Sequence, residues 1–183
     1  YMERKGIIKT YETNLIVMMK AVDEKRMDEF YDIPIKGSLP NRGQVIIGEG
    51  LANRIGKNLK DEITLFSPID QVYGLGFPPM KEVEISGIFS TRILNYDDSF
   101  IFMSLEDGKN LFRRKTAYDG FDIKISNDTT IEIVKSELLN IVGHNLNIKS
   151  WQDKNRSLID AMKMERLGAI AILGLIFLVA SFN

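Results

Sequence analysis

The residue types that most often carry out chemistry are scarce in this chain. It has no cysteine and one histidine, His144, which excludes cysteine-liganded metal and a pair of histidine ligands. Asp97 and Asp98 are adjacent carboxylates, and in an extended segment their side chains point to opposite faces. This favours a loop or turn role over general acid–base catalysis, and the serines have no recognisable histidine–acid partners. The sequence therefore predicts no catalytic residues and no metal site.

The stretch GEGLANRIGKN, residues 48–58, has the outline of a nucleotide-binding loop. A P-loop needs four residues between its glycines and then Lys-Ser/Thr. Here five residues separate Gly50 from Gly56, and Lys57 precedes Asn58. The third glycine of a dinucleotide-binding fingerprint would fall at Asn53. We therefore interpret the stretch as a turn and short helix after a strand, and we expect no cofactor in this chain.

The stretch PIDQVYGLGFPPM, Pro68 to Met80, combines turn residues with bulky apolar ones, and it holds three of the five prolines. It is too long for a tight hairpin turn between the apolar runs on either side. If its centre is extended, Tyr73, Leu75 and Phe77 point to one side, and the prolines stiffen its base. Two hypotheses stay open: the segment folds back on its own sheet, or it protrudes as an arm that binds a partner.

The elements around these residues are predicted to be rich in strands. Alternation predicts strands at Ile7–Tyr11 and Leu15–Val22, with a short charged segment after them. Residues 44–66 predict strand, glycine turn, short helix and strand, and residues 97–112 predict a strand followed by a short helix. Between these two stretches, a strand at 81–89 places Val83, Ile85 and Phe89 on one buried face.

The last third of the chain predicts one more strand–helix–strand sequence. Phe121, Ile123 and Ile125 alternate with charge in a strand at 118–126, and residues 146–151 form a last short strand. Between them a clear amphipathic helix is predicted from apolar residues at helical spacing, namely Ile131, Val134, Leu138 and Ile141.

The C-terminal residues predict a helix that enters a membrane. Ser150 and Asp153 suit a helix N-terminus, and the helix continues without proline into an apolar tail. From Leu167 to Phe182 there is no charged residue, so we interpret this run as the start of a transmembrane helix. A buried C-terminal helix is the alternative.

Charge excludes one further class of function. Lysine and arginine number 24 against 25 for aspartate and glutamate. A protein that binds nucleic acid is normally strongly basic. The sequence therefore predicts no nucleic-acid partner.

Four stretches resemble a known family when they are taken in order. They are QVIIGEGLANRIG with LKDEITLFSP, KEVEISGIFSTRILNYDDSFIFMSLEDGKNLF, DGFDIKIS, and IKSWQDKNRSLIDAMKMERLGAIAILGLIFLVASFN. Together they look like the LolC/LolE lipoprotein-releasing permeases, which have a MacB-like periplasmic domain and FtsX-like membrane helices. The resemblance runs from about Asp23 to the end of the chain and is closer to LolC, because a proline-bounded, glycine-rich arm stands where LolC has its hook.

The resemblance implies an α+β fold built from two subdomains and a membrane helix. A discontinuous βαβ-type Porter subdomain would take residues 1–32 and 118–152. An inserted, β-rich Sabre subdomain would take residues 33–117, with a hook hairpin at about 68–79. Residues 153–183 would be a connecting helix that runs into a truncated transmembrane helix at about 167–183.

The resemblance also implies a function in the inner membrane of a Gram-negative bacterium, with this domain in the periplasm. The permease would extract outer-membrane lipoproteins and pass them to a LolA-like chaperone. ATP would be hydrolysed on a separate LolD-like ABC ATPase, and a second permease subunit, LolE-like or identical, would complete the transporter. The implied pad residue is Lys81, and the implied chaperone-binding hook residues are Pro68, Val72, Tyr73, Leu75, Phe77, Pro78 and Pro79.

Two alternatives stay open beside this one. A MacB-type efflux pump or another FtsX-like permease would dock an adaptor protein and would not need the apolar arm. A membrane-anchored scaffold that regulates a cell-wall enzyme is the third hypothesis. Depletion distinguishes them, through mislocalised lipoproteins, drug sensitivity or division defects respectively.

Overall fold

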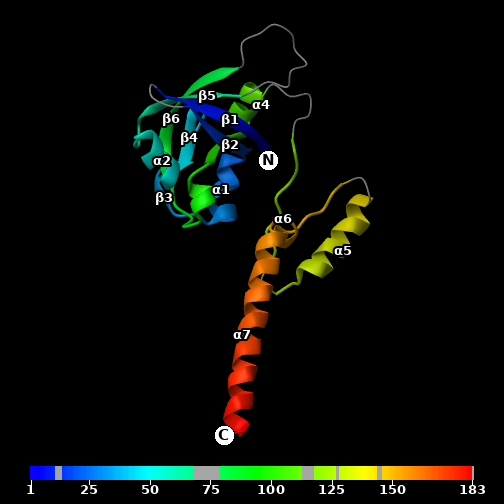
Figure 1. Cartoon of the computed structure of the whole chain (residues 1–183). Helices are drawn as coiled ribbons and strands as arrows, with labels where there is room; N and C mark the ends of the chain where they lie inside the picture. Colours follow the sequence, from blue (N-terminus) through cyan, green and yellow to red (C-terminus); the bar gives the residue numbers. More distant parts are fainter. Residues whose placement is uncertain (11–13, 68–78, 113–117, 127, 144–145, 183) are drawn as a thin grey trace. The chain divides into compact units, whose positions relative to one another are not determined.

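The computed structural model of the chain describes residues 1–10, 14–67, 79–112, 118–126, 128–143 and 146–182 (Figure 1). It divides into two compact units, Tyr1–Ile123 and Lys124–Asn183. The first unit is a sheet with short helices, and the second is helical. A mixed α+β fold with a C-terminal apolar helix is therefore confirmed.

The first unit contains seven strands and four helices among its described residues. The strands are β1 (Met2–Lys9), β2 (Asn14–Val22), β3 (Ile35–Gly37), β4 (Gln44–Gly48), β5 (Glu62–Phe66), β6 (Met80–Phe89) and β7 (Phe100–Ser104). The helices are α1 (Glu24–Tyr31), α2 (Glu49–Ile55), α3 (Leu94–Asp97) and α4 (Leu105–Phe112).

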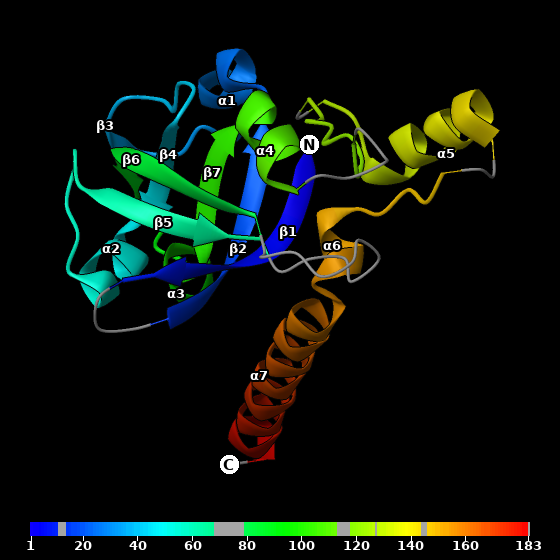
Figure 2. The same ribbon diagram turned by 90° about the horizontal axis from the view of Figure 1, so that it is seen from above.

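Six of the strands form a closed ring of pairings. The order is β6-β4-β7-β2-β1-β5, and β5 pairs back onto β6, while β3 pairs with the end of β6. The β2–β7 and β4–β6 pairs are parallel and the others are antiparallel. Figure 2 shows these strands curving around a shared interior. Closure leaves few free strand edges, which protects the sheet from unwanted pairing.

Alternation along the strands fills the interior of this ring with apolar side chains. The inner cluster includes Val17, Met19, Ala21, Val45, Ile47, Ile63, Leu65, Val83, Ile85, Ile101 and Met103. Leu51 of α2 and Leu111 of α4 join it. Because β4 and β7 are antiparallel and are followed directly by α2 and α4, the two helices cover opposite ends of the ring.

The other face of β4 and β7 carries a second cluster, rich in aromatic rings. Ile46 and Phe102 point to this side and pack with Phe89 and with Met27 of α1. The Phe89 and Phe102 rings meet edge to face with centroids 5.4 Å apart, a favoured aromatic geometry. The helix α1 was not predicted; Asp23 caps it by accepting a bond from the Lys25 amide, and Met27 anchors it.

The prediction that Val83, Ile85 and Phe89 share one buried face is wrong for Phe89. Ile85 pairs with Val45, but the next residue of β4, Ile46, pairs with Gly87. Ser86 is therefore an extra residue in β6, a β-bulge that reverses the alternation. Phe89 is buried, but in the second cluster rather than the first.

The second unit contains α5 (Ile131–Val142), α6 (Trp151–Lys154) and α7 (Arg156–Phe182). The amphipathic helix is confirmed as α5, although each of its residues keeps some exposure. The two strands predicted beside it are wrong, since the described residues of 118–126 and 146–150 form no strand and Trp151 already begins α6. Alternation alone cannot make a strand without a neighbouring strand to pair with.

The predicted helix start at Ser150 is confirmed as a capping box. The Ser150 hydroxyl accepts a bond from the Asp153 amide, and the Asp153 carboxylate accepts one from the Ser150 amide. Bonds from Lys135 and Ser150 hold the pKa of Asp153 well below its usual range. Asn155 separates α6 from α7, so the helix is interrupted there by one turn residue.

The Porter and Sabre boundaries stay a prediction. The strands β1 and β2 come from the predicted Porter segment 1–32, and β3 to β7 come from the predicted Sabre segment 33–117. Both sets of strands pair within one sheet.

Candidate functional site

An antiparallel pair of strands, β5 and β6, flanks the stretch that is predicted to form an apolar arm. Phe66, the last residue of β5, pairs with Met80, the first residue of β6. The Ser67 amide then donates to the Pro79 carbonyl at 3.1 Å, which extends the pairing of β5 and β6 by one bond and would form the base of an arm. Seven residues were predicted to form the hook, and of these the structure describes Pro79. The other six lie outside the described residues: Pro68, Val72, Tyr73, Leu75, Phe77 and Pro78.

An exposed apolar row crosses the outer face of the sheet at this base. Ile16 of β2 pairs with Ile7 of β1, Ile7 pairs with Phe66 of β5, and Phe66 pairs with Met80 of β6. Directly opposed residues share a face, so the four side chains form one row. Ile16 is 74% exposed and Met80 is 60% exposed, whereas Ile7 and Phe66 between them are half-buried. The sequence did not predict this row, because it depends on the register of four strands.

Lys81, the predicted pad residue, lies on the inner side of the same strands. It pairs with Leu65, which is fully buried, whereas its neighbours Met80 and Glu82 are exposed. Its ammonium group forms an ion pair with Asp107 of α4, which is 1% exposed. The other carboxylate oxygen of Asp107 accepts a bond of 2.6 Å from the Gly43 amide. Contact between Lys81 and a partner stays a prediction.

The buried residue Lys20 holds the segment around Asp122 against the sheet. The Lys20 ammonium lies 2.6 Å from Asp122 Oδ2, and the Tyr31 hydroxyl donates to the same oxygen at 2.9 Å. The ammonium also lies 4.6 Å from the centroid of the Tyr1 ring and 5.2 Å from that of Tyr31. Burial, together with the nearby Asp122 carboxylate, raises the pKa of Tyr31 far above its ordinary value. Tyr31 is therefore a neutral donor at every physiological pH.

Asp97 and Gly56, two of the residues considered above for catalysis and nucleotide binding, have structural roles. Asp97 is buried and accepts bonds from the amides of Thr91 and Arg92 and from the Thr91 hydroxyl. Gly56 ends α2 in the left-handed conformation at φ 63°, as glycines commonly do. The turn and short helix expected at 48–58 are thus confirmed, and His144 lies outside the described residues.

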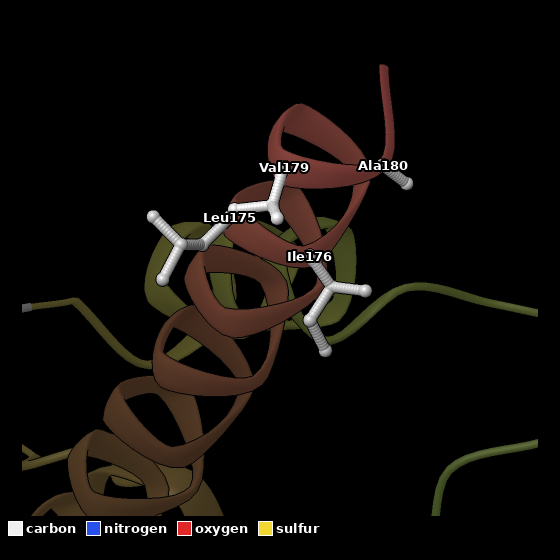
Figure 3. Close-up of a pocket in the computed structure, with 4 residues that line it drawn as sticks. All are labelled: Leu175, Ile176, Val179 and Ala180. Atoms are coloured by element: carbon white, nitrogen blue, oxygen red, sulfur yellow. The ribbon is translucent and has the colours of Figure 1, made fainter. Parts of the chain in front are cut away.

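No candidate metal site emerges from the described part of the chain. It contains no group of three or more histidine, cysteine, aspartate or glutamate side chains that could hold a metal ion. Figure 3 shows a hollow lined by Leu175, Ile176, Val179 and Ala180, all from α7. It is a depression between side chains of one exposed apolar helix.

The helix α7 is long and apolar enough to cross a membrane. It has 27 residues, a mean hydropathy of 1.9 over its best window, and none of that window is buried in the described structure. A span needs about 20 apolar residues. The predicted tail is therefore an exposed helix with the composition of a membrane span.

Curated relatives match this chain over its whole length, whereas no family model matches it. It is 24% identical over 183 residues to the lipoprotein-releasing system transmembrane protein LolC of Neisseria meningitidis serogroup B, covering 99% of this chain and 42% of the relative. It is 30% identical over 190 residues to LolC of Buchnera aphidicola subsp. Schizaphis graminum, covering 100% of this chain and 47% of the relative. The chain thus spans less than half the length of these relatives, and its resemblance to LolC is confirmed.

Among solved structures, the chain is similar to the extracellular domain of the noncanonic ABC-type transporter YknZ from Gram-positive bacteria. It has a TM-score of 0.42 and 13% identity, covering 59% of this chain and 54% of that one.

Proposed function

We propose that this chain is the periplasmic part, with the following membrane helix, of a LolC-type inner-membrane ABC permease. The permease extracts outer-membrane lipoproteins and passes them to a LolA-like periplasmic chaperone. The observation that carries this proposal is the similarity along the whole chain to LolC from two organisms. The apolar helix α7 supports it, because a permease domain must be joined to the membrane.

In this proposal the arm at 68–79 binds the chaperone. Its base is a regular β5–β6 ladder closed by the Ser67–Pro79 bond, so the arm has a firm support. Tyr73, Leu75 and Phe77 supply the apolar contact, and burying each would contribute roughly 1.5–3 kcal/mol before ordering costs. The apolar row of Ile7, Ile16, Phe66 and Met80, whose two ends are exposed, lies at the same base and adds apolar surface.

The chain itself acts mechanically in this proposal. ATP is hydrolysed on a separate LolD-like subunit, and a second permease subunit completes the transporter. Motion passes through α7 and α6 to the periplasmic domain. The capping box at Ser150 supports this role, because it fixes the start of the helical connection.

Site-specific photo-crosslinking from Leu75 in the full-length permease tests the proposal in cells. We expect a crosslink to a LolA-like chaperone. A crosslinker at Lys36, an exposed residue of the edge strand β3, is the control and should capture no chaperone. Crosslinks from Leu75 that stay within its own domain would remove the hook role, and crosslinks to an adaptor protein would favour an efflux pump.

A further inference from the structure

The Lys81–Asp107 ion pair lies where the arm joins the body of the protein. Lys81 follows Pro79, the last residue of the arm, by two positions, and Asp107 is in the first turn of α4. The start of β6 and the end of β7 lie at the same end of the ring, because β6 is parallel to β4 and β4 is antiparallel to β7. The pair thus joins the outgoing stem of the arm to the helix that covers this end.

The surroundings of Asp107 make a cation necessary there. The residue is 1% exposed, and a buried carboxylate without compensation is strongly unfavourable. The Gly43 amide and the Lys81 ammonium each bind one of its oxygens. Among the described residues, Lys81 is the cation that forms an ion pair with it. The charge of Lys81 is therefore used inside the fold.

The orientation of the Lys81 side chain also indicates a role inside the fold. Met80 and Glu82, on either side of it, face outward, whereas Lys81 follows the inward register of Val83 and Ile85. Its side chain is 25% exposed, and its ammonium reaches toward α4 rather than away from the protein. A partner that contacts the outer row would meet Met80 and not the charge of Lys81.

We infer that Lys81 is a positioning residue, which acts through Asp107 to fix the base of the arm, and that its ammonium does not bind the partner. This inference rests on the proposed function of the arm. It separates two roles that a sequence pattern cannot distinguish, since a lysine beside an arm suits both a contact residue and an internal anchor.

Removing one charge or both charges distinguishes the two roles. In Lys81→Met the buried Asp107 carboxylate loses its cation, and we expect the Leu75 crosslink to the chaperone to fall by about 10-fold. In Lys81→Met with Asp107→Asn the buried charge is also gone, and the amide oxygen can still accept from Gly43. We expect this double variant to recover the crosslink to within about threefold of wild type.

A contact role predicts a different result, because the partner would lose the ammonium in both variants. A double variant that reaches the membrane at the wild-type level but crosslinks as poorly as Lys81→Met would overturn the inference. Lys36→Met, which removes an exposed lysine of β3, is the matched control and should leave the crosslink unchanged.

A second readout does not depend on the chaperone. Protease digestion of the full-length permease in membranes reports how firmly the domain is folded. We expect Lys81→Met to shorten the half-life of the domain about 10-fold, and the double variant to restore most of it. If wild-type Leu75 captures no chaperone but this rescue occurs, the proposed function fails and the anchor stands. The single variant Asp107→Asn completes the comparison. If the changes in the logarithm of the half-life in the two single variants add up to the change in the double variant, the anchor itself is overturned.

Discussion

The absence of a side chain at Gly108 lets the helix α4 approach the strand β2 closely. Gly108 lies in the buried face of α4, and a Cβ atom added to it would collide with the Cβ of Ala21. The neighbouring residues Asp107 and Leu111 are buried on the same side of the helix. Glycine is unfavourable in a helix interior by about 1 kcal/mol, so its presence here reflects packing. The same close approach brings Asp107 within reach of Lys81.

Replacing this glycine tests the packing. We expect Gly108→Ala to lower the free energy of unfolding by about 1–2 kcal/mol, because overpacking outweighs the gain in helix propensity. Urea unfolding measures the change. Asn110→Ala, at an exposed position of the same helix, is the control and should be neutral or slightly stabilising. A Gly108→Ala protein as stable as wild type would show that α4 can shift without cost.

At the scale of elements, the segment 118–123 is held to the sheet mainly by polar contacts. The Glu3 amide donates to Asp119 at 2.8 Å, and the Asp119 amide donates to the Tyr1 carbonyl at 3.0 Å. Lys20 and Tyr31 hold Asp122. Phe121, in contrast, is 80% exposed, so it contributes little burial. In the proposed function this clasp lies on the path of the chain between the sheet and the membrane helix.

Asp122→Asn tests whether the clasp holds the segment. A hydrogen bond to a charged group contributes about 1.5–3 kcal/mol, so we expect the Asp119 amide to exchange its hydrogen about 10- to 100-fold faster. Hydrogen exchange resolved by residue gives this rate. Asp128→Asn removes an exposed carboxylate and should not change it. An unchanged Asp119 rate in Asp122→Asn would mean that the hydrogen bonds of Asp119 with Tyr1 and Glu3 suffice.

The elements that could be predicted from the sequence are those specified by local pattern. The strands, turn and helix across 44–66 have their own alternation and glycine bends, and the start of α6 has its capping residues. The strand expected at 118–126 has equally good alternation, but pairing depends on a neighbour. The reversal at Ser86 depends on register with β4. Local pattern therefore predicts segments, and long-range pairing decides which of them become strands.

The candidate site likewise has features that depend on local sequence pattern and features that depend on long-range contacts. The stretch Pro68–Met80 stands out in the sequence because it combines prolines and bulky apolar residues in one connection, and its role as an arm stays a prediction. The partners of Lys81 and Lys20 could not be predicted, since Asp107 and Asp122 lie 26 and 102 positions further along the chain. The role of Lys81 follows from the ring, which brings β6 close to α4, and the role of Lys20 follows from the packing of the segment 118–123 against β1 and β2.

At the scale of the whole molecule, the proposed function requires α7 to transmit movement between the membrane and the periplasmic domain. A helix transmits movement only if it is stiff, and α7 runs for 27 residues from Arg156 to Phe182. Its first residues are charged and its later ones apolar, so the part from Arg156 to about Arg166 lies outside the membrane in this proposal. The single turn residue Asn155 joins it to the capped helix α6.

A proline in the exposed first part of α7 tests this coupling. Met162→Pro removes a backbone hydrogen bond and bends the helix, at a cost of about 3 kcal/mol. We expect the complete transporter in proteoliposomes to keep hydrolysing ATP but to lose most lipoprotein release, because the movement is no longer passed on. Met162→Ala, which keeps the helix, should release normally. Normal release by Met162→Pro would mean that movement reaches the domain by another route, since a bent α7 cannot act as a rigid lever.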